Sequence, residues 1–191
     1  GAAFVVDPQI DISPWEKKMC ERGAKLRGVL LTHSHWDHVR GIPGIIKKYS
    51  AAEVPIFVHP DDAVRITDAE EKKRVRLFRE GEHIPLGKGF VEILHTPGHS
   101  IGECSFLIRG TPDVLLTGDT VFVGEVGRTD LPTGNTAQLF TSIQRIKKLA
   151  PETLIYPGHD YGKRWTSTVA YESAHSKAFL CKTVEELDAL P

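Results

Sequence analysis

The chain has 191 residues, of which 40% are hydrophobic and 26% are charged, a balance typical of one globular domain and not of a disordered or fibrous chain. The 24 lysines and arginines nearly match the 25 aspartates and glutamates, so the formal net charge is -1, which excludes a global field that attracts nucleic acid or an anionic membrane. No apolar run approaches the ~18 residues of a membrane span, and the first residues lack the features of a secretion signal, so we expect a cytoplasmic protein with neither nucleic acid nor a membrane as partner.

Short apolar runs alternate with amphipathic segments, which favours an α/β architecture. In the first half of the chain, apolar runs predict strands at 4–6, 26–32 and 54–59. Ser13 and Glu16 have the spacing of a capping box, so a helix is predicted from Ser13 to Gly23. Residues 45–49 are predicted to be helical, and the charged segment 61–78 is predicted to be a helical excursion.

The second half repeats this pattern. Apolar runs predict strands at 90–94, 104–108, 114–117 and 153–156. Apolar residues recur at helical spacing between Thr136 and Leu149, which predicts an amphipathic helix with one packed face. Further helices are predicted through residues 169–171 and after Thr183, where Glu186 is the box partner.

The cysteines are Cys20, Cys104 and Cys181, which lie far apart and form no Cys-x-x-Cys pair. Their number and spacing argue against a disulfide framework and against a thiolate zinc site. We predict that all three are buried packing residues.

The predicted strand at 26–32 runs into the string HSHWDH at residues 33–38. In an extended segment residues i and i+2 project to one side, so His33 and His35 can reach one point in space. Asp37 and His38 follow where the chain turns toward a helix, and their side chains can reach a neighbouring point. Imidazole and carboxylate suit divalent zinc, iron or manganese, so this one loop can serve two ions.

Three later strands are also followed by a small residue and then a potential ligand, namely His99, Asp119 and His159. Glycine beside each lets the backbone turn tightly and approach a metal ion. Side chains that follow several strands of one α/β domain tend to meet at one rim of the sheet. We therefore predict one site that joins them to residues 33–38, and an ordinary structural role for His59, His83, His95 and His175.

The segments HSHWDH, TPGHS, TGDT and YPGHD resemble the successive metal motifs of the metallo-β-lactamase superfamily. The resemblance implies a single domain over residues 1–191, folded as an αββα sandwich of two facing sheets, with helices outside and the metals at one edge. It also implies how the ligands divide: a first ion on His33, His35 and His99, a second on Asp37, His38 and His159, and Asp119 bridging the two.

Such a centre favours hydrolysis. Two divalent cations lower the pKa of bound water toward ~7 and stabilise a developing oxyanion. We expect both ions to be Zn²⁺, with iron or manganese as the alternative metals. Asp37 can hold the attacking water or accept its proton, and it is the predicted catalytic residue. Hydrolysis of an activated carbonyl is the expected reaction.

Within the superfamily the chain is most similar to the glyoxalase II and persulfide dioxygenase branches. Residues 124–131 resemble a GRTD loop, and residues 159–161 resemble a His-acidic-Tyr element in which the tyrosine lies close to a thiol substrate. Tyr161 and Arg128 are therefore the predicted substrate-binding residues. Arg128 clamps a carboxylate of the substrate, or it pairs with Asp130 to shape the loop.

Two reactions use these ligands. The favoured one is hydrolysis of a thioester of glutathione or a similar small thiol by a metal-bound hydroxide. The alternative is a persulfide dioxygenase with one Fe²⁺ on His33, His99 and Asp119, which oxidises a glutathione-type persulfide to sulfite. A nuclease is disfavoured by the balanced charge and a β-lactamase by Asp119, where those enzymes usually place cysteine. The non-enzymatic alternative is a metal-holding binding module, which predicts tight metal binding without turnover of any thioester, persulfide, lactone or phosphodiester.

Two departures from the family pattern concern the ends of the chain. The family normally has a strand or two before the segment that matches Phe4, and full-length glyoxalase II has a helical C-terminal domain that helps to hold glutathione. Only about thirty residues follow His159 here. We expect both the first strands and the helical domain to be lacking.

Overall fold

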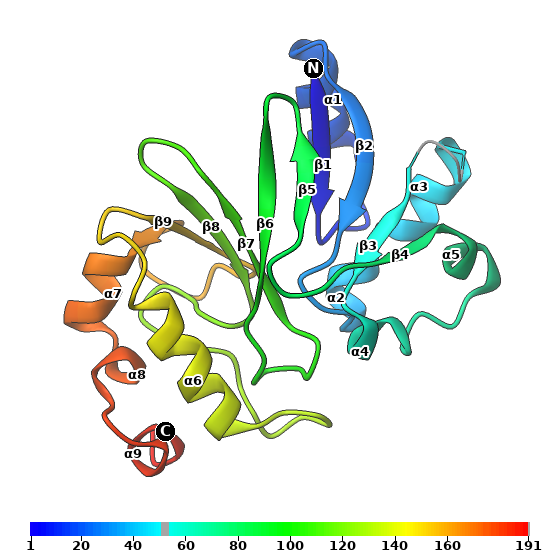
Figure 1. The fold of residues 1–191 in the computed structure, drawn as a ribbon. Coiled ribbons are helices and arrows are strands. Elements are labelled where there is room, and N and C mark those ends of the chain that lie inside the picture. Colours follow the sequence, from blue (N-terminus) through cyan, green and yellow to red (C-terminus); the bar gives the residue numbers. More distant parts are fainter. Residues whose placement is uncertain (51–53, 191) are drawn as a thin grey trace.

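The computed structural model describes residues 1–50 and 54–190, which form two facing β-sheets with helices on their outer sides (Figure 1). The first sheet is parallel, with the strand order β1-β2-β3-β4. Its strands are β1 (Ala2–Val6), β2 (Lys25–Leu30), β3 (Ile56–Val58) and β4 (Val75–Leu77). The helices of this half are α1 (Ser13–Glu21), α2 (Trp36–Val39), α3 (Ile42–Lys48), α4 (Pro60–Ala63) and α5 (Ala69–Arg74).

The second sheet is mixed and has the strand order β10-β9-β8-β7-β6-β5, with β8 and β9 parallel. Its strands are β5 (His83–Leu86), β6 (Gly89–His95), β7 (Cys104–Ile108), β8 (Val114–Gly118), β9 (Leu154–Pro157) and β10 (Ser167–Thr168). The helices of this half are α6 (Thr136–Ile146), α7 (Val169–His175), α8 (Lys177–Leu180) and α9 (Val184–Asp188).

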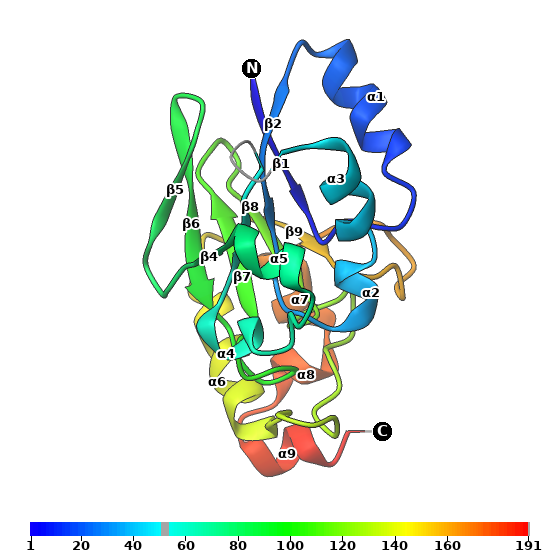
Figure 2. The same cartoon turned by 90° about the vertical axis from the view of Figure 1, so that its right-hand side faces the viewer.

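Three apolar clusters account for the layered arrangement. Leu30 of the first sheet packs with Ile93 and Phe106 of the second, which forms the core between the sheets. Ile42 and Ile45 of α3 cover the outer face of the first sheet, and Leu139 and Ile143 of α6 cover that of the second. The order of layers is therefore helix, sheet, sheet, helix, as expected from the sequence, and the view in Figure 2 shows the two sheets with α1 and α3 outside the first.

The predicted strands and the long helix at 136–149 are confirmed, with small changes at their ends. The segment 61–78 is the largest correction, because it contains α4, α5 and then β4 in place of one helix. Asp68 caps α5 by accepting hydrogen bonds from Glu70 N and Glu71 N. The residues after α5 form β4, which pairs with β3. This tertiary pairing overrides the helix that the spacing of the charged residues predicted.

The capping box predicted at Ser13 is wrong. Ser13 is already helical, and its hydroxyl and N–H donate to Asp11 Oδ1 instead of the hydroxyl accepting from a later N–H. Glu16 accepts from Lys48 Nζ and Tyr49 Oη, at 2.8 and 2.7 Å. At Thr183 the cap is confirmed, since its hydroxyl accepts from Glu186 N, but the Glu186 carboxylate accepts from Lys182 N in place of the Thr183 N that a box requires.

Smaller features were also missed. The edge strand β5 carries a proline, which is typical of edge strands and weakens a sequence-based prediction. Cys104 and Cys181 are buried as predicted, but Cys20 is exposed. It lies on α1, which has no buried residue.

Within residues 1–50 and 54–190, no helix has both the length and the apolar character that crossing a membrane requires. The expectation that the chain lacks the first strands and a helical C-terminal domain stays a prediction.

Candidate metal centre

The predicted ligands meet at one edge of the sandwich, and both sheets contribute them. His33 and His35 follow β2 of the first sheet, and Asp37 and His38 lie on the short helix α2. The other three ligands follow strands of the second sheet: His99 after β6, Asp119 after β8 and His159 after β9. The site therefore lies where two sheets meet, whereas the sequence suggested the rim of one sheet.

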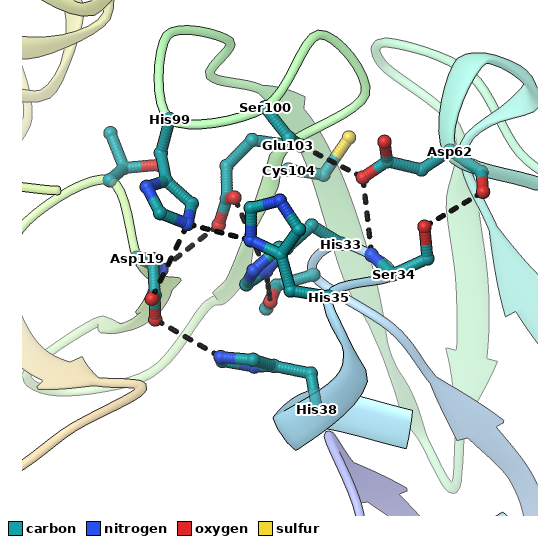
Figure 3. Close-up of polar contacts among 12 residues, drawn as sticks. His33, Ser34, His35, His38, Asp62, His99, Ser100, Glu103, Cys104 and Asp119 are labelled. Carbon is teal, nitrogen blue, oxygen red and sulfur yellow. Dashed lines mark hydrogen bonds and ion pairs between the residues drawn. The ribbon is translucent and has the colours of Figure 1, made fainter. Parts of the chain in front are cut away.

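The side chains form three groups, of which two have the predicted composition and the third joins Asp119 to His33 and His38. The ligand atoms within each group lie within 4.8 Å of one another, and the groups are His33, His35 and His99; Asp37, His38 and His159; and His33, His38 and Asp119. His35 Nδ1 lies 2.9 Å from His99 Nε2, and His38 Nε2 lies 3.2 Å from His159 Nε2. Figure 3 shows the imidazoles of His33, His35 and His99 pointing toward a shared space beside Asp119.

Asp119 stands between the two outer groups. Its Oδ2 lies 3.6 Å from His99 Nε2 and 3.4 Å from His159 Nε2, and its Oδ1 lies 3.3 Å from His38 Nε2. One carboxylate therefore faces ligands of both groups, which is the arrangement expected of a bridging residue.

The donor set fits divalent cations. His33 Nε2 and Asp119 Oδ1 are buried without a hydrogen-bond partner among the described residues, although buried polar atoms nearly always have one. Gly158 lacks a Cβ that would lie 2.5 Å from Asp119 Oδ1, so the backbone leaves room beside that oxygen. Converging imidazole nitrogens and carboxylate oxygens are the ligands that zinc and iron take.

Two carboxylates behind the ligands were missed in the sequence. Asp7 Oδ2 accepts a hydrogen bond from His38 Nδ1 at 2.9 Å, and its Oδ1 accepts from Thr32 N. Glu103 is fully buried; its Oε2 lies 3.2 Å from His33 Nδ1 and its Oε1 accepts from Asp119 N. Such contacts leave the opposite nitrogen of each imidazole free to face a metal. Asp7 had a usable signal, since it follows β1 at the same edge as Thr32.

The protonation of the histidines follows from burial and from their neighbours. Burial and the nearby imidazoles hold the pKa of His33 well below its usual value, and burial with His99 and Arg65 lowers the pKa of His35 to about 4. Burial also disfavours the charged form of His38, but the carboxylates of Asp119 and Asp7, one beside each ring nitrogen, outweigh burial and raise its pKa to about 11. The carboxylates therefore favour a positive charge on His38, while the lowered pKa values of His33 and His35 keep these two imidazoles neutral and able to coordinate.

A cavity of about 420 Å³ opens onto the ligands. Both predicted substrate residues line it, together with Trp36, Arg65 and Leu131, which the sequence did not single out. Arg128 is also paired with Asp130, with Nε to Oδ1 at 2.6 Å, so the loop-shaping contact considered from the sequence is present. Tyr161 stacks on the ring of His159, with centroids 5.0 Å apart.

The four remaining histidines lie outside these groups, as predicted. His59 stacks on His95 with ring centroids 4.3 Å apart, His83 stacks on Phe90, and His175 stacks on Tyr171.

Comparison with known proteins agrees with this geometry. Residues 1–159 match the family model of the metallo-beta-lactamase superfamily. A hydroxyacylglutathione hydrolase from Thermosynechococcus vestitus is 31% identical over 164 residues, which cover 86% of this chain and 61% of that protein. The chain thus spans about three fifths of the length of this relative.

Two solved structures extend the likeness. ETHE1 from Myxococcus xanthus has a TM-score of 0.81 and 29% identity, and the match covers 100% of this chain and 82% of that one. TTHA1623, solved in a di-iron-bound form, has a TM-score of 0.71 and 30% identity, with coverage of 90% and 86%. The ligand motifs, the double sheet and these matches agree, and the chain belongs to the metallo-β-lactamase superfamily.

Proposed function

We propose that the protein is a dinuclear metallohydrolase that cleaves a thioester of glutathione or a similar small thiol. The observation that carries this proposal is the position of Asp119, whose two oxygens face His99 on one side and His38 on the other. Two ions use all seven side chains as ligands, whereas a single ion on His33, His99 and Asp119 leaves four of them without a metal. The similarity to a hydroxyacylglutathione hydrolase supports the choice of substrate class.

The two outer ligand groups would each hold one metal ion. His33, His35 and His99 would hold one ion, Asp37, His38 and His159 the other, and Asp119 both. When bound, divalent ions supply Lewis acidity, which makes water a nucleophile at neutral pH and stabilises the charge that develops on a carbonyl oxygen.

Asp37 is the carboxylate placed to handle the proton of the attacking water. Its side chain is 29% exposed and lines the cavity, whereas that of Asp119 is 9% exposed and lies deeper. A carboxylate that reaches both ligands and cavity can orient a water molecule and accept its proton.

The cavity wall suits an anionic thiol with an extended organic part. Arg65 and Arg128 supply two guanidinium groups, and the exposed rings of Trp36 and Tyr161 supply flat apolar surface. Guanidinium groups bind carboxylates in a bidentate manner, and glutathione-type thiols carry carboxylates.

A persulfide dioxygenase is the second candidate. It would use one Fe²⁺ on His33, His99 and Asp119, whose side chains are 0%, 6% and 9% exposed. Their types match the two-histidine, one-carboxylate set of iron oxygenases. The likeness to a protein solved with two iron ions supports iron as a metal to test.

Metal analysis of protein purified without oxygen, followed by assays on both substrate classes, tests the proposal. We expect close to two metal ions per chain and release of free thiol from a glutathione thioester. One iron per chain with persulfide-dependent oxygen uptake, and no thioester cleavage, would overturn the hydrolase in favour of the dioxygenase.

A further inference from the structure

Asp62 is a carboxylate without exposed surface that the proposed reaction does not use. It lies on α4, in the first half of the chain, and Figure 3 places it on the far side of the ligand loops from Asp119. Charged side chains are almost never fully buried unless they are paired. The partners of Asp62 therefore indicate what it does.

The first partner is Ser34, the residue between the ligands His33 and His35. Side chains alternate along an extended segment, so Ser34 points away from the two imidazoles and toward α4. Ser34 N donates to Asp62 Oδ2 at 3.2 Å, and the Ser34 hydroxyl donates to the main-chain carbonyl of Asp62 at 2.8 Å. Asp62 thus accepts hydrogen bonds from both the N–H and the hydroxyl of Ser34, the residue between two ligands.

The second partner is Ser100, which follows the ligand His99. Its hydroxyl donates to the same oxygen, Asp62 Oδ2, at 2.8 Å. The turn after it packs directly on α4, since a Cβ on Gly102 would lie 2.8 to 2.9 Å from atoms of Asp62. A single buried oxygen therefore joins a loop of the first sheet to a loop of the second.

The third partner is Arg65, whose Nη1 donates to Asp62 Oδ1 at 2.5 Å. This ion pair compensates the buried charge, which otherwise has a high desolvation cost. The same guanidinium also contacts the loop that precedes α6, where its Nη2 donates to Thr133 Oγ1 at 2.8 Å. Both oxygens of Asp62 are thus occupied.

We propose that Asp62 is a positioning residue that sets the separation between His99 and the His33–His35 pair, and so controls affinity for the ion that these three histidines hold. The inference rests on the proposed metal centre. The second group is held differently, since His38 is oriented by Asp7. In the described part of the chain, the hydrogen bonds of Asp62 join it to Ser34, to Ser100 and to residues in or next to α4, and none of them reaches a ligand of the second group.

The test is the variant Asp62→Asn, whose amide has the same size but replaces one acceptor oxygen with a donor. Removing the support behind a metal ligand typically weakens metal affinity by ~10–100-fold. We expect that loss for the Zn²⁺ ion on His33, His35 and His99, and an unchanged affinity for the other Zn²⁺ ion. Chelator competition measures the two affinities, and Co²⁺ substitution identifies the altered site by its absorption. Asp61→Asn is the matched control, because Asp61 is on the same helix and its side chain is 51% exposed.

A second readout separates positioning from general stability. At a fixed Zn²⁺ concentration, tighter binding to the folded state gives a larger rise in Tm, which grows with the logarithm of the affinity. The Zn²⁺-induced rise should therefore be smaller in Asp62→Asn than in wild type. Ser100→Ala removes only one of the hydrogen bonds and should shift the same affinity in the same direction, which keeps the test informative if Asp62→Asn folds poorly.

Three outcomes overturn the inference. They are wild-type affinity for both ions in Asp62→Asn, equal weakening of both ions, and a lower Tm with an unchanged Zn²⁺-induced rise. In each of these the wild-type protein still binds two ions, so the proposed function survives. A wild-type protein that binds no Zn²⁺, Co²⁺ or Fe²⁺ instead overturns the metal centre and the inference together.

Discussion

At the scale of single residues, each buried ligand is oriented by a group behind it. His33 lies against Glu103, His38 against Asp7, and His99 Nδ1 donates to the carbonyl of Arg128 at 2.9 Å. A histidine held in this way presents its other nitrogen in a fixed direction without moving when a metal arrives. Contacts within the protein therefore orient these three imidazoles.

Asp37→Asn tests the proposed base. The amide keeps the shape of the side chain but cannot accept a proton, and loss of a general base typically lowers kcat by ~10²–10⁴-fold. Thioester turnover should be measured together with metal content, so that a lost ion is distinguished from a lost base. Asp160→Asn, an exposed neighbour of His159, is the control. Wild-type kcat in Asp37→Asn with both ions bound would contradict the assignment.

Gly158→Ala tests the space beside Asp119. The added Cβ would lie 2.5 Å from Asp119 Oδ1 and 3.0 Å from Gly118 O. We expect loss of at least one metal ion per chain and a stability cost of ~1–3 kcal/mol from overpacking, measured by metal analysis and urea unfolding. Gly89→Ala should change neither metal content nor activity, because its nearest contact would be at 3.8 Å. Full metal content in Gly158→Ala would show that Asp119 has room to move.

At the scale of elements, loops of the site are held in place by helices that come later in the chain, after further strands. The N terminus of α6 is bound to the loop that carries His99, because Asn135 N donates to Gly98 O at 2.8 Å and Ser142 Oγ donates to Pro97 O at 2.7 Å. Glu172 of α7 is buried and accepts from Gly124 N at 2.9 Å, which anchors the loop that leads to Arg128. Each helix thus contributes to the core and also holds a loop of the site through polar contacts.

Asn135→Ala tests one of these anchors. The Asn135 side chain caps α6 by accepting a hydrogen bond from Gln138 N at 2.9 Å, and removal of such a cap costs about 1 kcal/mol of unfolding free energy. Urea unfolding of the metal-free protein measures the loss. Thr141→Ala, on the exposed side of the same helix, should be close to neutral. A larger loss in the control than in Asn135→Ala would contradict the capping role.

At the scale of the whole molecule, the chain passes from one sheet to the other between β4 and β5. Glu80 lies in this connection and makes a two-point ion pair with Arg145 of α6, at 2.8 and 2.5 Å, while His95 N donates to it at 2.6 Å. Burial raises the pKa of Glu80, but the hydrogen bonds from Arg145 and His95 N outweigh burial and lower it. One carboxylate thus links the crossing segment to both β6 and an outer helix.

This pKa shift predicts a pH dependence of stability. Because the folded pKa of Glu80 lies below the unfolded value of about 4.3, its ionised form stabilises the fold above that pH, and the contribution is lost as the pH falls through the folded pKa. Wild type should therefore exceed Glu80→Gln in unfolding free energy at neutral pH, and the difference should shrink in acid. Glu82→Gln, an exposed neighbour, serves as control. A difference that grows on acidification would contradict the sign.

The ligands were recognisable in the sequence because each has a local signature, an apolar strand followed by a small residue and an imidazole or carboxylate. Because alternate side chains of an extended segment point to the same side, the sequence was enough to predict that His33 and His35 lie together, and the structure places them in one ligand group. The strands were equally visible, since burial of a strand in a sandwich requires a continuous apolar run.

Tertiary structure alone decided what supports those ligands. Asp62 reaches Ser34 and Ser100 across 28 and 38 residues of sequence, and Glu103 reaches Asp119 across 16. Aspartate, glutamate and serine are common surface residues with no periodic pattern, so nothing local distinguishes the buried ones. The helical prediction for 61–78 failed for the same reason, because pairing of β4 with β3 and burial of Arg74 depend on partners distant in the chain.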